Sequence, residues 1–271
     1  MHPLINEQMV EHIRSTGHAL EDQPNRVEIM DSLGLPYDRP AENIVIMGCQ
    51  NLRLMPSVIQ TFARILDRGG MDFTFLSREY CCGNYLYRPA IKARDGEAIT
   101  ECRSYSKEFT GLNIEQMKRL GGRRMILFCS PCYPIYKQAF PDKDIIFYPQ
   151  AISEVVGALH WPKEIDYYAG CYKLHRNLAE VPMDLKSANT VFNKIEGLSI
   201  NRISAPACCY KPEGLTHMID QVQTDCMVHI CTGCYFQATF NMPKDRQVQI
   251  LMLPEFINMI QEGDLSGQNH Q

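Results

Sequence analysis

The sequence predicts an α/β protein whose 271 residues form two similar halves, each built on a parallel β-sheet. Two observations predict this class. Short apolar runs of β type alternate along the chain with segments of helical period, which is typical of parallel sheets covered by helices on both faces. In addition, ten of the 12 cysteines fall into two series of five in the same order, and the segments that flank them also repeat.

The first half opens with an apolar strand at 43–48, which ends at Gly48-Cys49. A helix at 56–68 begins at Pro56 and ends before Gly69-Gly70, which are typical start and stop residues. Further strands are predicted at 71–77, 124–129 and 144–148, and further helices at 89–119, 132–140 and 150–160.

The second half repeats this alternation after a boundary near 160–163. Strands are predicted at 164–169, 199–204, 226–231 and 248–253, and helices at 183–196, 213–222, 233–240 and 254–261. We therefore expect two duplicated, Rossmann-like halves with parallel sheets.

The composition excludes several classes of protein. The chain is 45% hydrophobic and 21% charged, which is typical of globular proteins and not of disordered ones. A net charge of −4 argues against nucleic acid or an anionic membrane surface as the main partner. No apolar run approaches the roughly 18 residues of a membrane span, and the N-terminus is too polar for a secretory signal. We expect a cytoplasmic protein with reduced thiols.

Each cysteine series consists of one cysteine after a glycine, then an adjacent pair, then a CxxC motif. The first series is Cys49, Cys81, Cys82, Cys129 and Cys132, and the second is Cys171, Cys208, Cys209, Cys231 and Cys234. In both halves the cysteines follow predicted strands, and parallel strands bring their C-terminal ends to one edge of a sheet. Each series is therefore expected to converge on one site. The other two, Cys102 and Cys226, have no counterparts and are expected to be ordinary buried thiols.

Five thiols per site point to a centre with more than one metal atom. A structural zinc takes four ligands, and two adjacent cysteines do not readily fill two corners of one tetrahedron. Neighbouring thiolates suit an iron–sulfur cluster, where they can reach different iron atoms. We predict one iron–sulfur cluster in each half, with zinc in one or both sites as the alternative.

The arrangement resembles the cysteine-rich CCG domain, and specifically the B-type family of heterodisulfide reductase proteins, which carry tandem CCG domains. The resemblance extends from Asn43 to Gly263 and is carried by the Gly-Cys, Cys-Cys and CxxC elements of both series. It implies a noncubane [4Fe–4S] cluster at each complete motif, near the interface of the two halves. It also implies an oxidoreductase that acts on sulfur groups, reducing a small disulfide or oxidising thiols as one member of a complex.

The family's partners are a C-type subunit with cubane [4Fe–4S] clusters and, in many complexes, a flavin-containing A-type subunit. The resemblance divides the chain into two CCG domains at 43–162 and 163–263, followed by a flexible tail at 264–271. Residues 1–42 precede the family's usual start and contain no cysteine, so we interpret them as a docking arm. One departure concerns Tyr210, which follows the second cysteine pair where the family usually has glycine, so zinc is an alternative for the second site.

Disulfide reduction consumes protons, and three cationic or titratable residues follow Cys171. Lys173, His175 and Arg176 are therefore candidate catalytic residues, although solvated loop charges explain them equally well. His229, within a strand beside Cys231, is expected to be a hydrogen-bonded core residue or a neighbour of the cluster ligands.

Two other functions stay open. The chain could be an electron-transfer subunit of a larger quinone-linked or acyl-CoA-reducing oxidoreductase, which disulfide turnover would distinguish. It could also be a zinc-stabilised assembly protein, which would be colourless and free of labile sulfide.

Overall fold

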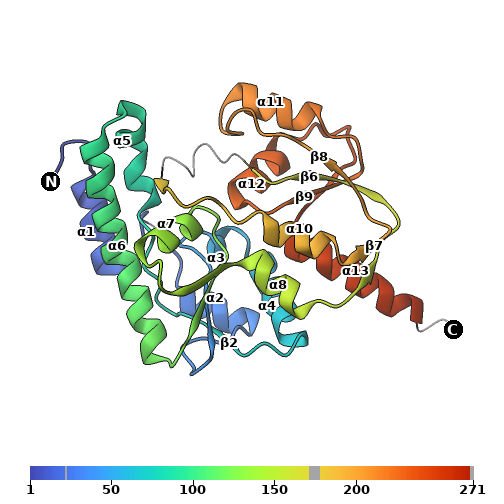
Figure 1. Cartoon of the computed structure of the whole chain (residues 1–271), viewed down its shortest axis with the longest axis horizontal. Coiled ribbons are helices and arrows are strands. Elements are labelled where there is room, and N and C mark those ends of the chain that lie inside the picture. The colour runs from blue at the N-terminus through green and yellow to red at the C-terminus, as the bar shows by residue number, and fades with distance from the viewer. Residues whose placement is uncertain (22, 171–177, 269–271) are drawn as a thin grey trace. The chain divides into compact units, whose positions relative to one another are not determined.

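The computed structural model describes residues 1–21, 23–170 and 178–268, and its chain divides into two compact units (Figure 1). Unit 1 comprises Met1–Gln60, Met71–Tyr148 and His175–Met183. Unit 2 comprises Thr61–Gly70, Pro149–Leu174 and Asp184–Gln271. Helix α4 (Pro56–Arg68) contributes its first residues to unit 1 and the remainder to unit 2.

Unit 1 is built on a four-stranded parallel sheet in the order β2-β1-β3-β4. Its strands are β1 (Asn43–Ile46), β2 (Phe73–Phe75), β3 (Arg124–Leu127) and β4 (Asp144–Phe147). Strands β1 and β2 are buried along their whole length, as expected for a parallel sheet covered on both faces. The helices are α1 (Glu7–Thr16), α2 (Arg26–Leu33), α3 (Asn51–Leu54), α5 (Tyr87–Ala93), α6 (Gly96–Arg119) and α7 (Cys132–Ala139), with a 3-10 turn η1 (Asn84–Leu86).

The N-terminal segment is part of unit 1. Helix α1 lies along α6 and buries Val10 and Ile13, while α2 buries Met30 (Figure 1). Each of these helices starts at an asparagine whose side chain accepts a backbone N–H bond and ends at a left-handed glycine, which are strong capping residues. Whether residues 1–42 also bind a partner protein stays a prediction.

The single helix predicted at 89–119 is wrong, because the chain breaks into α5 and α6 at Arg94-Asp95. Arg94 adopts a left-handed φ of 56°, and the Asp95 side chain accepts a bond from the Ala98 N–H to cap α6. A capping aspartate competes with helix continuation because its carboxylate satisfies the first free N–H groups of a new helix.

Unit 2 repeats the sheet of unit 1. Its strands are β6 (Glu164–Tyr168), β8 (Ser199–Arg202), β9 (Cys226–His229) and β10 (Gln249–Met252), all parallel in the order β10-β9-β6-β8. In chain order, the first, second, third and fourth strands occupy the same places in both sheets. The prediction of two Rossmann-like α/β halves is therefore confirmed.

The helices of unit 2 differ from the predicted ones mainly at their ends. They are α8 (Tyr148–Val155), α10 (Lys186–Phe192), α11 (Pro212–Asp220), α12 (Thr232–Asn241) and α13 (Leu253–Gln268). In a small parallel pair, β5 (Leu159–His160) occupies the end of the helix predicted at 150–160, and β7 (Ile195–Glu196) occupies the end of the helix predicted at 183–196. Helix α13 continues to Gln268, so the segment expected as a tail begins as helix.

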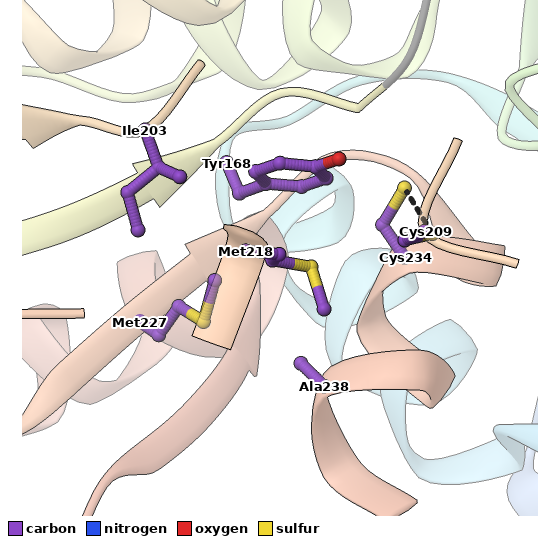
Figure 2. Close-up of a cluster of buried hydrophobic side chains, with 7 residues drawn as sticks. All are labelled: Tyr168, Ile203, Cys209, Met218, Met227, Cys234 and Ala238. Carbon is purple, nitrogen blue, oxygen red and sulfur yellow. Dashed lines mark hydrogen bonds between the residues drawn. The ribbon is translucent and has the colours of Figure 1, made fainter. Parts of the chain in front are cut away.

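A buried cluster in unit 2 joins the sheet to α11 and α12. Figure 2 shows its members, which are Tyr168, Ile203, Cys209, Met218, Met227, Cys234 and Ala238. The Tyr168 ring extends from β6 with its hydroxyl end toward the side where two cysteines lie. Two members of the second cysteine series, Cys209 and Cys234, are thus part of the hydrophobic core of their unit.

Among the described helices, none combines the length and the apolar composition that crossing a bilayer requires.

Candidate metal centre

Three loops of unit 1 bring the first cysteine series to the C-terminal edge of its sheet. Cys49 follows β1, the pair Cys81-Cys82 follows β2, and Cys129 follows β3, while Cys132 begins α7. The sheet places β1 between β2 and β3, so the three loops are neighbours in space.

The five thiols form a continuous chain of interacting neighbours. Cys49 bonds to Cys81, Cys81 to Cys82, Cys82 to Cys132, and Cys132 to Cys129. Residues that are 83 positions apart in sequence are thereby joined through sulfur atoms. The structure thus brings together all five residues that the sequence predicted for the first site.

Protonation differs along this chain of thiols. The hydrogen bond to Cys81, together with burial, raises the pKa of Cys49 well above its ordinary value. Cys82 accepts bonds from Cys132 and Cys81, which lowers its pKa. Because the thiolate is the form that binds metal, the lowered pKa of Cys82 favours its metal-binding form.

Glycine permits the close approach of the Gly-Cys loop to the CxxC motif in each unit. Gly48 has a φ of 91°, and a Cβ placed on it would lie 2.6 Å from the Cβ of Cys129. Gly170 in unit 2 has a φ of 104°, and its Cβ would lie 3.3 Å from the Cβ of Cys231. The Gly-Cys element of each series therefore needs glycine both for its backbone conformation and for space.

A buried carboxylate ties two of the cysteine loops together. Glu79, two residues before Cys81, accepts hydrogen bonds from the backbone N–H of Met47 at 2.5 Å and of Gly48 at 3.0 Å. It also pairs with Arg26 of α2 at 3.3 Å, and both side chains are at most 7% exposed. Burial raises the pKa of Glu79, and the charge of Arg26 acts in the opposite direction.

The backbone of the cysteine pair is held from three further sides. The Cys81 N–H donates to the carbonyl of Gly17 in the N-terminal segment at 2.8 Å. The Ser106 hydroxyl of α6 donates to the Cys82 carbonyl at 2.7 Å. Asn113 of α6 bonds both backbone groups of Tyr80, at 2.9 and 2.7 Å. The position of the pair is therefore set by elements that contain none of the predicted ligands.

Sequence reasoning missed these supporting residues. Glu79 could have been noticed as an acidic residue two positions before the adjacent cysteines. Nothing in the sequence around Arg26 indicates its partner, since the two residues are joined only by the fold. The segment interpreted as a docking arm thus supports the site from within unit 1.

Unit 2 brings together the described cysteines of the second series. Cys209 and Cys234 are buried, with sulfur atoms 3.5 Å apart (Figure 2). Hydrogen bonds also join Cys208 to Cys209 and Cys231 to Cys234, and the bond to Cys208 raises the pKa of Cys209 to about 12. Cys171 lies outside the described residues.

Tyr210 takes the place of the glycine in the first series without requiring its conformation. Gly83 has a φ of 76°, whereas Tyr210 is not among the described residues with positive φ, and the Lys211 N–H turns back to the Cys208 carbonyl at 2.9 Å. The Tyr210 ring covers the CxxC turn, where a Cβ on Gly233 would lie 3.2 Å from it. The tyrosine therefore fills space over the second site and remains 66% exposed.

His229 occupies the last position of β9, two residues before Cys231, and is fully buried. Burial lowers its pKa to about 4, so the imidazole is neutral near pH 7, while negative charge at Cys231 acts in the opposite direction. Its ring makes edge contacts with Tyr168 and Tyr235.

The remaining candidates are three charged or titratable residues after Cys171 and the two cysteines outside both series. Lys173, His175 and Arg176 lie outside the described residues. Cys102 is fully buried in α6 and Cys226 is 5% exposed at the start of β9. Burial raises the pKa of Cys102 to about 11 and of Cys226 to about 12, as expected for inert core thiols.

The grouped thiols fit an iron–sulfur cluster by their chemistry. In the part of the chain that the structure describes, no three or more His, Cys, Asp or Glu side chains are arranged to hold a single metal ion as they stand. The sulfur atoms of unit 1 instead extend as a chain of pairs, in a largely buried setting that also contains polar side chains such as Asn51, Glu79 and Ser130. Thiolates in such a setting are the ligands that iron–sulfur clusters use.

Comparison with known families matches residues 44–134 to a cysteine-rich domain, CCG. The matched segment contains the whole first series and ends two residues after Cys132. No curated protein matches the chain, and no solved structure does. The match and the grouped thiols indicate a metal-binding, electron-transfer role.

Proposed function

We propose that this chain is the iron–sulfur subunit of a heterodisulfide-reductase-like complex. It reduces a small disulfide to two thiols, or oxidises thiols in reverse, at two noncubane [4Fe–4S] clusters. The reaction takes up two electrons and two protons for each disulfide cleaved. A C-type partner with cubane clusters exchanges the electrons, with a flavin-containing A-type subunit as a further member of the complex.

The observation that carries the proposal is the chain of five thiols in unit 1. Four ligands would complete a zinc site, whereas this group has a fifth sulfur and an adjacent pair held rigidly between β2 and η1. The same elements recur in unit 2 on a sheet of the same topology. The duplicated arrangement supports one cluster in each unit.

The chain's own residues would hold each cluster and shield it from water. The five cysteines of each series would be the ligands, and the clusters would supply one-electron storage next to an iron site open to sulfur. Glu79 and Gly48 would fix the first two loops relative to the CxxC motif. Lys173, His175 and Arg176 remain our candidates for the proton source.

The deciding experiment measures iron, zinc and acid-labile sulfide per chain after anaerobic purification. We expect about eight iron and eight sulfide atoms, four of each per cluster. EPR after mild oxidation, recorded with and without added thiols, then tests whether the clusters bind sulfur ligands. Turnover of disulfides with a reduced dye as electron donor tests the enzymatic reaction.

Each alternative has a distinct result. Eight iron atoms with no effect of thiols on the spectrum and no disulfide turnover would indicate an electron-transfer subunit. Zinc without sulfide would indicate a zinc-stabilised assembly protein. About four iron atoms with one zinc would place the cluster in unit 1 and zinc beside Tyr210.

A further inference from the structure

We propose that a cavity in unit 1 binds a small organic anion, a ligand with one carboxylate group and a short apolar body. The cavity lies beside the first cysteine series and is a site of its own. The inference goes beyond the proposed function and does not depend on it, because the residues that would bind the anion are not metal ligands.

Helices α5 and α7 of unit 1 both pack against α6 (Figure 1), and the three helices enclose the cavity together with Leu178. Its volume is about 150 Å³, and it is partly open to solvent. A cavity of this volume accommodates a ligand of about six non-hydrogen atoms, the size of a benzene ring. The cavity therefore suits a small organic molecule and is too small for a nucleotide or a flavin.

The inner part of the cavity is apolar. Tyr87 of α5, Ile135 of α7 and Leu178 line it, and each of them is at most 3% exposed. Side chains of this kind offer few hydrogen bonds to water, whereas a hydrocarbon group buried against them leaves water favourably. This part of the cavity therefore fits the apolar body of a ligand.

Two cations of α6 line the same cavity. Arg103 and Lys107 stand four positions apart, so they lie on one face of the helix, one turn from each other. Like charges at this spacing repel, and no acidic residue stands three or four positions from either of them on α6 to offset the repulsion. An anion bound between the two side chains would offset it.

The protein itself satisfies these cations only in part. Arg103 forms one ion pair among the described residues, in which its Nη1 atom lies 3.3 Å from Glu180. The Glu180 side chain is 81% exposed, and a pair with so exposed a member contributes little. Lys107 forms no ion pair in the described part of the chain. Because a guanidinium has five N–H donors, Arg103 keeps most of them for a ligand.

The polar groups around the cavity are mainly donors. The Oε1 atom of Gln138 accepts the backbone N–H of Glu180 at 2.8 Å, which leaves the amide nitrogen of Gln138 as a donor. The hydroxyl proton of Ser106 is used by the Cys82 carbonyl, at 2.7 Å. A guanidinium, an ammonium and an amide N–H₂ select a ligand that only accepts, and a carboxylate is such a ligand.

The cavity adjoins the supports of the first cysteine series without reaching its sulfur atoms. Ser106 lines the cavity and also bonds the Cys82 carbonyl, and Ile135 stands three residues after Cys132 on α7. None of the described lining residues is a cysteine. The anion would therefore bind beside the cysteine pair and not on a sulfur atom.

The test measures butyrate binding to the anaerobically purified full chain by isothermal titration calorimetry. Two other ligands separate the two features of the site. Butyramide has the same size and body but no charge, and formate has the charge but no apolar body. One butyrate should bind per chain, about tenfold more tightly than either comparison ligand. Equal affinity for butyrate and butyramide, or no binding of butyrate, would overturn the inference.

Variants then locate the anion. Arg103→Gln should weaken butyrate binding about tenfold, the loss of one charge-assisted hydrogen bond, and Lys107→Gln should also weaken it. Glu180→Gln removes a competing carboxylate and should strengthen binding about two- to fivefold. Lys118→Gln, which removes an exposed charge of α6 outside the cavity, is the matched control and should change nothing.

Thermal unfolding and iron content are measured on every variant, so that loss of binding is separated from loss of structure. Folded Arg103→Gln that binds butyrate as wild type does would place the anion elsewhere and overturn the inference. Weaker binding in Glu180→Gln would overturn it as well, because the sign of the charge effect would be wrong. Absence of iron from wild-type protein would count against the proposed function and leave this test intact.

Discussion

Glu79 connects three parts of unit 1 through one carboxylate. It bonds the loop that precedes Cys49, lies just upstream of Cys81 and pairs with Arg26 from the N-terminal segment. The Nε and Nη1 atoms of Arg26 have no hydrogen-bond partner among the described residues, so the arginine depends heavily on this carboxylate and on the Leu76 carbonyl.

Removing either member of this buried pair should destabilise the protein strongly. Glu79→Gln or Arg26→Met leaves a buried charge without its partner, and we expect each to lower the free energy of unfolding by about 3 kcal/mol. The double variant contains no buried charge without a partner. Its free energy of unfolding should therefore fall by about 1–3 kcal/mol less than the sum of the two single effects. Anaerobic urea denaturation of the four proteins measures this coupling, and strict additivity would contradict it.

The role of Gly48 can be tested by comparison with Gly121, a glycine that also has a positive φ but has open space around its Cβ position. Gly48→Ala forces a Cβ against Cys129, whereas Gly121 has a φ of 75° and nothing within 4 Å of its Cβ position. Gly121→Ala should cost only the roughly 1–2 kcal/mol of a left-handed side chain and keep all its iron. Gly48→Ala should cost more and lose the iron of unit 1. Equal iron content in the two variants would show that the approach to Cys129 is not required.

At the scale of elements, the N-terminal helices support the cysteine pair. The Gly17 carbonyl at the end of α1 accepts the Cys81 N–H, and a Cβ on Gly17 would lie 2.4 Å from the Glu79 carbonyl oxygen. Helix α1 can hold this position because Val10 and Ile13 are fully buried.

Loosening α1 should therefore weaken the first site at a distance. Ile13→Ala removes buried atoms and should cost about 2–5 kcal/mol, with partial loss of iron from unit 1. Gln8→Ala, on the exposed face of the same helix, should change stability by less than about 0.5 kcal/mol and keep its iron. Thermal unfolding and iron analysis compare the two. If Ile13→Ala and Gln8→Ala had the same thermal stability and the same iron content, α1 would not support the first site, and the docking-arm interpretation would be favoured.

The sequence predicted the elements that have strong local patterns. All eight strands of the two main sheets lie within their slightly longer predicted ranges, and most of them are apolar runs, which are distinctive in a sequence. Helix α4 has its predicted bounds, since Pro56 and Gly69 mark both of them. The break at Arg94 and the pair β5-β7 were missed because a single capping residue or a two-residue strand changes the local pattern very little.

The same distinction applies to the site, where features set by local sequence were predicted and features set by long-range contacts were not. Ligand spacing and strand order are sequence properties, and they predicted the convergence of all five thiols in unit 1. The Arg26–Glu79 pair and the His229–Tyr168 register depend on which segments meet in three dimensions, and no local pattern contains that information.

At the scale of the whole molecule, duplication has kept the sheet and the ligands while changing their surroundings. Both sheets have the same strand order, and in both units the last cysteine of the CxxC motif lies in the helix after the third strand, Cys132 in α7 and Cys234 in α12. The glycine after the first cysteine pair has become Tyr210, and the buried Leu127 has become His229. We therefore expect two centres that bind independently of each other.

Independent binding is tested by removing one ligand from each unit. Cys82→Ala should lower the iron content from about eight to about four atoms, and Cys209→Ala should do the same through unit 2. Cys102→Ala and Cys226→Ala remove equally buried thiols outside both series and should keep all the iron, at a cost of roughly 1 kcal/mol in stability. Complete loss of iron from either ligand variant would mean that the two centres assemble as one, and iron loss from Cys102→Ala would extend the ligand set beyond the two series.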